Sequence, residues 1–478
     1  MPDKSHVKRA CDQCHGLKEK CRRPDIKSPC ERCSRLQKDC VTRRQATRTG
    51  RKPRNLQKLS YTLPISTNQK DCTGYLTLPR DGLILAVPSP YDGGLATNPS
   101  LFPTLDEWEQ YFLTLMKDVP APSLLNKFLI GSSFHKSHHV SFIQNFVGPS
   151  RALKHATVAC AAALLGEEND DYAKAGAEIG HKRAALAVSS LRSFKILNEQ
   201  DLSTVLFLGV AMVTFAMHVA DGQPLLISHF TLNLVRPQIQ NVYAMDPTIV
   251  DYWMCLVSTE IFDCLLRSDV PSTRIDPRKR HNVVDRYLGV SSSIFPHLYD
   301  ICEAAQSLKQ ASVAAVVKAV GHLDSIRIAV DQWQPSPPSG FLDQYTQTEV
   351  VSMLSQAKIF RLAALLIIHR LHYPYGEQDR EAFILCRAII SEFDMILQFT
   401  QRSIPCTMLA YLAACFEIMD PHARNIALQR SQDIVTFSKV SRLKFQTALT
   451  SVWEARDNGN HFHWFDISQY ASLGTACK

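Results

Sequence analysis

Six cysteines near the start of the chain recur with a spacing suited to metal binding. They follow the pattern C-x2-C-x6-C-x8-C-x2-C-x6-C, in which the unit C-x2-C-x6-C occurs twice, nineteen residues apart. A C-x2-C pair lets two thiolates converge on one ion at the start of a helix, and the third cysteine returns to the ion after that helix. The six residues are Cys11, Cys14, Cys21, Cys30, Cys33 and Cys40.

The number of cysteines predicts how the metal is shared. Two tetrahedral Zn²⁺ ions need eight ligand positions, and six cysteines supply eight only if two of them bridge. The repeat indicates the first member of each unit, so Cys11 and Cys30 are the expected bridges. One ion is then held by Cys11, Cys14, Cys21 and Cys30, and the other by Cys11, Cys30, Cys33 and Cys40. Both sites lack an open position for water, which predicts two structural ions.

The residues around the cysteines cannot build a core of their own. The first 54 residues contain no Phe, Trp or Tyr and few branched aliphatic residues, too little to offset the entropy of ordering. We expect zinc binding to fold this segment, because a structural zinc ion contributes a binding free energy on the order of 10 kcal/mol. Three disulfides, or one four-cysteine site with two spare thiols, are the alternatives. No apolar signal-peptide region follows the first residues, so we expect a reducing compartment and metal-bound thiols.

Positive charge is concentrated in the same segment. The 478-residue chain has 53 Lys+Arg and 45 Asp+Glu, a formal charge of +8. Residues 1–54 hold 17 Lys+Arg and 6 Asp+Glu, a formal +11, and the rest holds 36 and 39, a formal −3. A small basic module on a near-neutral body is typical of nucleic-acid binding. The 45% hydrophobic and 21% charged composition excludes a wholly disordered, collagen-like or coiled-coil chain.

The cysteine segment resembles the fungal Zn2Cys6 (binuclear zinc cluster) transcription factors. The matching stretches are Arg9-Ala-Cys-Asp-Gln-Cys-His-Gly-Leu-Lys-Glu-Lys-Cys21 and Cys30-Glu-Arg-Cys-Ser-Arg-Leu-Gln-Lys-Asp-Cys40. The resemblance implies that the helix after Cys14 enters the major groove of double-stranded DNA and that Lys18 contacts bases, typically of a CGG triplet. Lysine can donate to guanine O6 and N7. Lys20 and Arg9 match positions that would contact phosphate and fix the register.

The segment after the cysteines reads as a linker. Half of the twelve residues 43–54 are basic, which predicts a segment that lies along the phosphate backbone of DNA. We expect Arg51, Lys52 and Arg54 to serve also as a nuclear import signal. Residues 55–106 carry six prolines and four glycines, which favours loops. No apolar heptads follow, so a zipper is not expected. The protein is expected to bind as a monomer or as a homodimer formed through its large domain.

The rest of the chain predicts a large all-helical domain, which makes the fold class mainly α. The domains expected are a DNA-binding cluster at 9–42, a linker at 43–105 and a helical regulatory domain at 106–470. Its residues 358–372, followed by Tyr-Pro-Tyr-Gly, also resemble the regulatory domain of the same family. Residues 202–220 lack Asp, Glu, Lys and Arg, and we interpret them as a core helix rather than a membrane span. The helices are expected near 107–118, 151–166, 171–194, 200–220, 248–266, 303–333, 346–372, 377–400, 406–418 and 421–437.

The sequence therefore predicts a nuclear, sequence-specific DNA-binding transcription regulator of RNA polymerase II promoters. No Walker A, zincin or G-x-S-x-G motif is present, and we expect no enzymatic activity and no membrane partner. The Gly-Arg-Lys-Pro-Arg linker resembles that of pathway-specific regulators of secondary-metabolite gene clusters. Coactivators or the transcription machinery are the implied protein partners. The alternatives are a zinc-ordered protein-interaction module and a DNA-tethered helical protein that senses a ligand or catalyses a reaction.

Overall fold

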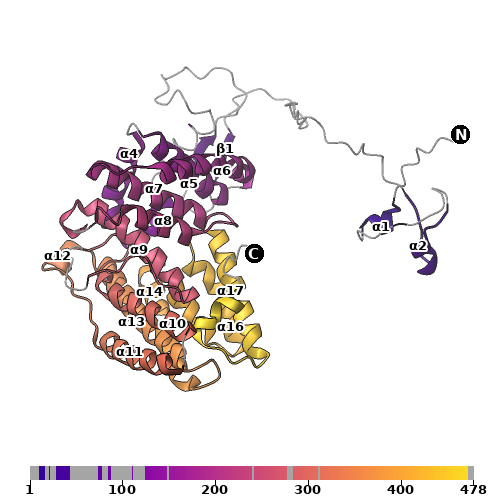
Figure 1. Cartoon of the computed structure of the whole chain (residues 1–478). Coiled ribbons are helices and arrows are strands. Elements are labelled where there is room, and N and C mark those ends of the chain that lie inside the picture. The colour runs from indigo at the N-terminus through magenta and orange to yellow at the C-terminus, as the bar shows by residue number, and fades with distance from the viewer. Residues whose placement is uncertain are drawn as a thin grey trace, which may run out of the picture. The chain divides into compact units, whose positions relative to one another are not determined.

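The chain divides into two units, residues 1–97 and 98–478, in a computed structural model (Figure 1). The first unit contains two short helices, α1 (Asp12–Gly16) and α2 (Glu31–Arg35), each of which begins directly after the first cysteine of a repeat. The structure describes residues 10–16, 21, 28–42, 74–77, 84–87, 110, 124–147, 150–168, 170–239, 242–276, 284–310 and 313–471.

A two-stranded antiparallel pair lies in the segment that we expected to be rich in loops. Strand β1 (Gly74–Thr77) pairs with β2 (Ile84–Val87), with Gly74 opposite Val87 and Thr77 opposite Ile84. The prediction missed this pair because it weighed the prolines and glycines of the whole segment. The short runs Gly-Tyr-Leu-Thr and Ile-Leu-Ala-Val contain aromatic and branched residues with a preference for strands.

The first half of the helical unit is a group of helices built around α7 (Figure 1). Helix α7 packs against α5, α6, α8 and α9, and α5 also packs along α6. Its N-cap Asn198 accepts a hydrogen bond from the backbone N–H of Asp201 at 2.9 Å. The elements of this half are η1 (Leu124–Phe128), η2 (Ser132–Phe134), α4 (His135–Val147), α5 (Arg151–Glu168), α6 (Asp170–Ser193), α7 (Glu199–Met217), α8 (Pro224–Val235), η3 (Val242–Ala244) and α9 (Pro247–Arg267).

The second half is centred on α13, which packs against α10, α11, α14 and α15. The N-terminus of α13 is closed by a capping box between Thr346 and Glu349. The elements of this half are η4 (Ser292–Ile294), α10 (Phe295–Gln310), α11 (Val313–Gln332), α12 (Phe341–Gln344), α13 (Gln347–His372), α14 (Asp379–Thr400), α15 (Met408–Phe416), α16 (Pro421–Ile434), α17 (Lys439–Asp457), η5 (Trp464–Asp466) and α18 (Ile467–Tyr470).

One continuous hydrophobic core joins the two halves, and it extends from Leu129 to Ala471. The end of the chain contributes to this connection, because α18 packs on α9 and the indole Nε1 of Trp464 donates a hydrogen bond to the carbonyl of Leu265 at 2.7 Å. Trp464 is fully buried. The helical unit is therefore a single body of packed helices.

The mainly α prediction is confirmed, with differences in individual helices. Residues 303–333 were expected to be one helix, but they contain the end of α10 and then α11, and these two helices pack against each other. An alanine- and valine-rich run gave no signal for the break. Helices α4, α8 and α17 were missed. Of the helix expected at 107–118, only Gln110 lies in the described residues, and it is helical.

Two helices, α7 and α13, are long and apolar enough to cross a membrane by length and composition alone. In each, 67% of the most apolar window is buried inside the unit. This is how the core helix of a globular domain behaves, and it matches the interpretation of residues 202–220 as such a helix.

Candidate metal centre and nucleic-acid interface

The structure brings all six cysteines together in two overlapping groups of four. The groups are Cys11, Cys14, Cys21 and Cys30, and Cys11, Cys30, Cys33 and Cys40. Within each group the Sγ atoms lie within 4.8 Å of one another. Cys11 and Cys30 belong to both groups, and their own Sγ atoms are 3.9 Å apart. These are the two ligand sets that the repeat predicted.

The two repeats make the same backbone contacts, which gives the cluster a local two-fold pseudo-symmetry. The Sγ of Cys11 accepts from the N–H of Cys14 at 3.4 Å, and the Sγ of Cys30 accepts from the N–H of Cys33 at 3.4 Å. Each shared sulfur therefore lies at the N-terminus of its own helix, α1 or α2.

The third cysteine of each repeat follows the same symmetry. The Sγ of Cys21 accepts from the N–H of Cys11 at 3.4 Å, and the Sγ of Cys40 accepts from the N–H of Cys30 at 3.2 Å. The backbone N–H of Asp12 also donates to the carbonyl of Val41 at 2.9 Å, which ties the two ends of the motif together.

The pKa values separate the two shared cysteines from their neighbours. The backbone N–H of Cys33 lowers the pKa of Cys30 to about 6. Burial opposes ionisation of Cys11, but hydrogen bonds from Cys14 and nearby thiols outweigh it, so that this pKa is also lowered. Burial raises the pKa of Cys14 to about 12 and raises that of Cys21. The shared sulfurs therefore ionise most readily, and ionisation of all six requires a cation among them.

The sulfur separations fit tetrahedral zinc. A tetrahedron with Zn–S bonds of about 2.3 Å has S···S edges of about 3.8 Å. The Sγ of Cys14 lies 3.6 Å from that of Cys30, and the Sγ of Cys11 lies 3.7 Å from that of Cys33. A disulfide needs about 2.05 Å, and all six cysteines are free thiols. The geometry therefore disagrees with the disulfide alternative and with a single four-cysteine site.

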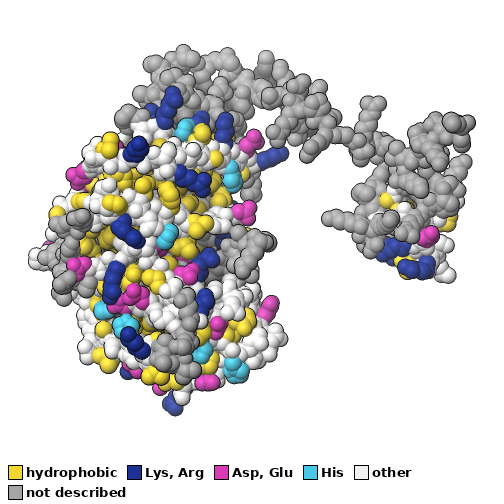
Figure 2. Space-filling model, in the orientation of Figure 1, with side chains coloured by type: hydrophobic (Ala, Val, Ile, Leu, Met, Phe, Trp, Pro, Cys, Tyr) yellow, Lys and Arg dark blue, Asp and Glu magenta, His cyan; other side chains and the backbone are white. Residues whose placement is uncertain are grey.

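The residues predicted to contact DNA lie outside the described part of the chain. These are Lys18, Lys20 and Arg9, together with the linker residues Arg51, Lys52 and Arg54. Among the described residues of this unit, Arg35 and Lys38 are exposed and Arg32 is half-buried, all on or next to α2. Figure 2 shows Lys and Arg side chains at the surface of this unit. The described surface of the second repeat is of mixed charge, because Glu31 and Asp39 are exposed beside these cations.

Sequence reasoning also missed a cavity in the helical unit. Its walls come from residues between Lys127 and Phe445, on helices that are far apart in the chain. No local motif marks such a site, because its parts meet only in the folded helical unit.

Family models match a part of each unit. Residues 9–49 match the fungal Zn(2)-Cys(6) binuclear cluster domain, and residues 250–473 match the fungal specific transcription factor domain. No match was found among curated proteins, and none among solved structures. The cluster domain binds zinc, and the six clustered cysteines are the groups that could hold the ions. The two domains together support a DNA-binding transcription regulator.

Proposed function

Because the chain carries both the binuclear cluster domain and the transcription factor domain of fungal regulators, we propose that it is a nuclear, sequence-specific regulator of RNA polymerase II promoters. The observation that carries this proposal is the pair of cysteine quartets that share Cys11 and Cys30, within a segment of formal charge +11. Two structural zinc ions would order this otherwise core-less segment, and its positive charge would attract the phosphate backbone.

We assign roles to the basic residues by their place in the cluster motif. Lys18 follows Cys14 by four positions and would donate to guanine O6 and N7 in a CGG triplet. Lys20 and Arg9 would contact phosphates and fix the register. Arg51, Lys52 and Arg54 would act in the linker, both along the phosphate backbone and in nuclear import.

Binding of the full chain to DNA tests this assignment. Fluorescence anisotropy with a CGG duplex and a scrambled duplex should show preference for CGG in the unchanged protein. Lys18→Ala should remove most of that preference, since one lost base contact costs about 1–3 kcal/mol of discrimination. Lys38→Ala, at an exposed position on the second repeat, should weaken both duplexes equally. Unchanged discrimination in Lys18→Ala would show that the base contact is assigned to the wrong residue.

The alternative of a zinc-ordered protein-interaction module makes a different prediction for salt. Binding to DNA through phosphates loses affinity steeply as salt increases, because condensed counterions are released. A module that binds only proteins would show no DNA affinity with this slope. A DNA-tethered enzyme would keep its turnover in Lys18→Ala, whereas a regulator would lose transcription of its targets.

The finer function that we propose is pathway-specific control of a secondary-metabolite gene cluster, through coactivators or the transcription machinery. The linker Gly-Arg-Lys-Pro-Arg supports this by its resemblance to such regulators. Genome-wide occupancy mapping, combined with transcript profiling of a deletion strain, tests it. Occupied promoters grouped in one biosynthetic cluster are expected, and occupancy spread over unrelated genes would contradict it. Size-exclusion chromatography of the full chain with a duplex that carries two CGG triplets tests whether a homodimer binds paired sites.

A further inference from the structure

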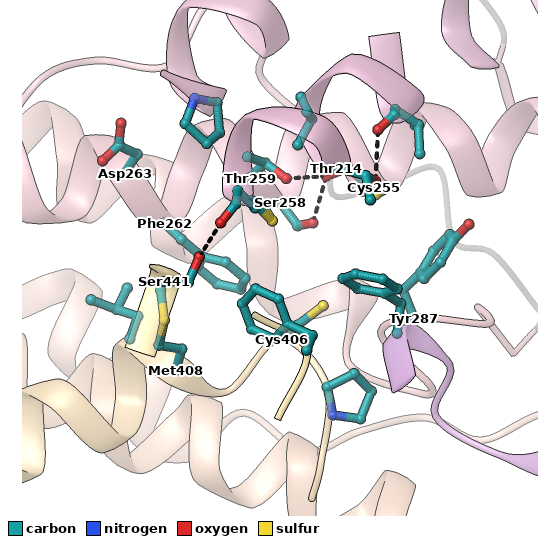
Figure 3. A pocket seen from close by; sticks show the side chains of 18 of the residues that line it. Thr214, Cys255, Ser258, Thr259, Phe262, Asp263, Tyr287, Cys406, Met408 and Ser441 are labelled. Carbon is teal, nitrogen blue, oxygen red and sulfur yellow. Dashed lines mark hydrogen bonds between the residues drawn. The ribbon is translucent and has the colours of Figure 1, made fainter. Parts of the chain in front are cut away.

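A cavity of about 810 Å³ lies inside the helical unit. It is bounded by α7, the start of α8, α9, the segment 403–409 and α17. Figure 3 shows Ser258 and Thr259 of α9 on one side and Cys406 and Met408 on the other. Protein interiors contain few voids larger than a water molecule, so a space of this size among the described residues points to an occupant.

The walls of this cavity are mostly apolar. Aromatic and thioether side chains contribute a large part of the lining: Phe207, Phe262, Phe437, Phe445, Met217 and Met408. Such residues form broad contacts with other apolar side chains, and methionine adapts to irregular shapes. An occupant would therefore gain most of its affinity from apolar burial.

One edge of the cavity is formed by η1, beside the end of α7. Lys127 and Phe128 of η1 line the cavity and are half-buried. The ring of Phe128 lies 6.3 Å from that of His218, directly after α7. Lys444 also lines the cavity, and its Nζ donates to the carbonyl of Val219 at 3.3 Å. The chain that leads into η1 therefore arrives within a few residues of this edge.

A segment with a suitable apolar face precedes η1 in the same unit, which begins at residue 98. The sequence predicts a helix over residues 107–118, and Gln110, its one described residue, is helical. At helical spacing Trp108, Phe112 and Leu115 fall on one face. An isolated helix of this length is marginal in water, so the segment needs a surface that covers its apolar face.

The charges of the segment and of the cavity edge are complementary. Asp106, Glu107 and Glu109 place three acids at the start of the segment, and Lys127 and Lys444 supply cations at the edge of the cavity. Burial lowers the pKa of Lys444, because its ammonium is partly removed from water. Acidic groups nearby would offset this cost, which favours an acidic occupant over a neutral one.

The connection between the segment and the cavity is short. Only the five residues 119–123 separate the segment from Leu124, and a fully extended chain spans at most about 3.6 Å per residue, or about 20 Å here. A short tether of this kind holds a segment beside its site at an effective concentration in the mM range. This favours an occupant from the same chain over a second copy or a separate partner.

We propose that residues 107–118 occupy this cavity as an amphipathic helix of the same chain. The apolar face would contact the lining, and the acids at the start of the segment would lie near Lys127 and Lys444. The proposal concerns packing within the helical unit, so it goes beyond the function given above and does not depend on DNA binding. It would make a segment outside the matched residues 250–473 part of the interior of the helical unit.

The first experiment measures hydrogen exchange of the full chain by mass spectrometry. Because an isolated helix of this length is marginal in water, its amides exchange slowly only when the helix packs on a surface. We expect the amides of residues 107–118 to exchange about tenfold or more slowly than those of an unstructured peptide. Exchange of this segment at the rate of an unstructured peptide would overturn the proposal.

A cavity-filling variant identifies the surface that protects the segment. Val210→Trp places an indole into the cavity from α7 and should raise the exchange rate of residues 107–118 about tenfold, while α13 keeps its protection as a sign that the unit is folded. Val317→Trp is the matched control, because Val317 is 72% exposed on α11 and outside the lining. Protection that persists in a folded Val210→Trp protein would overturn the proposal.

The second experiment is photo-crosslinking of the full chain with p-benzoylphenylalanine in place of Phe112. We expect peptides joined to the cavity lining, such as those that contain Met217 or Met408, in a product with the mass of one chain. The same group in place of Gln110, on the opposite face at helical spacing, should give no link to the lining. Links from position 112 only to other surfaces, no link at all, or a product with the mass of two chains would each overturn the proposal.

Discussion

Arg370 and Glu417 form a bidentate ion pair in the interior of the helical unit. The Nε of Arg370 donates to Oε1 of Glu417 at 2.8 Å, and Nη2 donates to Oε2 at 2.6 Å. Their side chains are 0% and 2% exposed. Nη2 also donates to Asp379 at 2.5 Å, and the guanidinium lies 4.7 Å from the centroid of the Tyr375 ring. This arrangement joins the end of α13 to the end of α15 and to the start of α14.

Replacing Arg370 should destabilise the helical unit strongly. In Arg370→Met, Glu417 would stay buried with only Arg456 near it, whose Nη1 lies 3.8 Å from Oε2, and breaking a buried pair in this way costs about 3–5 kcal/mol. Urea unfolding followed by circular dichroism measures the change. Arg327→Ala is the control, because Arg327 and Asp324 are 4.0 Å apart and each 54% exposed, and such pairs contribute about 0–1 kcal/mol. Equal losses in the two variants would contradict a special role for the buried pair.

Zinc content should depend on which cysteine is replaced. Elemental analysis of the full chain should find two zinc ions per chain. Cys30→Ser should lose both ions, because its sulfur belongs to both quartets, whereas Cys14→Ser removes a ligand from one ion only.

The thiol of Cys406 lies outside the cluster, so Cys406→Ser should retain both ions. A Cys30→Ser protein that still binds two ions with unchanged affinity would exclude a bridging sulfur at this position.

Acid should weaken the contact between α13 and the start of the helical unit. Burial disfavours the charge of Glu349, but hydrogen bonds from Ser133 and Thr346 outweigh it and hold its pKa below the usual 4.5. The stabilisation is therefore present above about pH 4.5 and is lost as the pH falls through the lower folded value. The difference in urea midpoint between the unchanged protein and Glu349→Gln should be largest at neutral pH and shrink in acid. Glu454→Gln, at an exposed position, should show no such trend.

The contribution of Asp285 to the stability of the fold should have the opposite dependence on pH. Burial raises its pKa from 3.8 to about 7, while its Oδ1 accepts from the N–H groups of Tyr287 and Leu288 at 2.7 Å. The charged form is penalised in the fold, so this residue reduces stability progressively as the pH rises from about 4 to about 7.

The variant Asp285→Asn keeps the acceptor oxygen and removes the charge. The urea midpoint of the variant minus that of the unchanged protein should increase across this pH range and stay constant above it. The charged groups around it, Asp251 and Arg286, are paired with each other at 2.5 Å. A difference that does not vary with pH would show that Asp285 is ionised in the fold throughout.

Sequence patterns predicted the structural features that are set by residues close together in the chain. They gave no signal for features that are set by residues far apart. The cysteine quartets were predictable because all their members lie within thirty positions and the repeat fixes their pairing. The strongly periodic helix α14 was predictable in the same way, and α13 was predictable because no Gly or Pro interrupts its 26 residues. Helix α8 was missed because its twelve residues are apolar on most sides and show no clear period.

Other features had no local signal at all. The position of Arg370 inside the core is set by Glu417, which lies 47 residues further along the chain. Tyr287 and Thr157 reach the same cavity from segments 130 residues apart. A charged residue in a helix is usually a surface residue, and only the packing of α13 against α15 reverses that expectation here.

Because Cys11 and Cys30 belong to both quartets, the two zinc sites cannot fill independently of each other. The first ion to bind deprotonates Cys11 and Cys30 and fixes their positions, so the second ion finds two of its four donors already in place. Loading would therefore be cooperative, and the form with both ions would fill over a narrow interval of free zinc rather than gradually. When free zinc falls below that interval, both sites would empty together, and the segment that holds the six cysteines would lose its order.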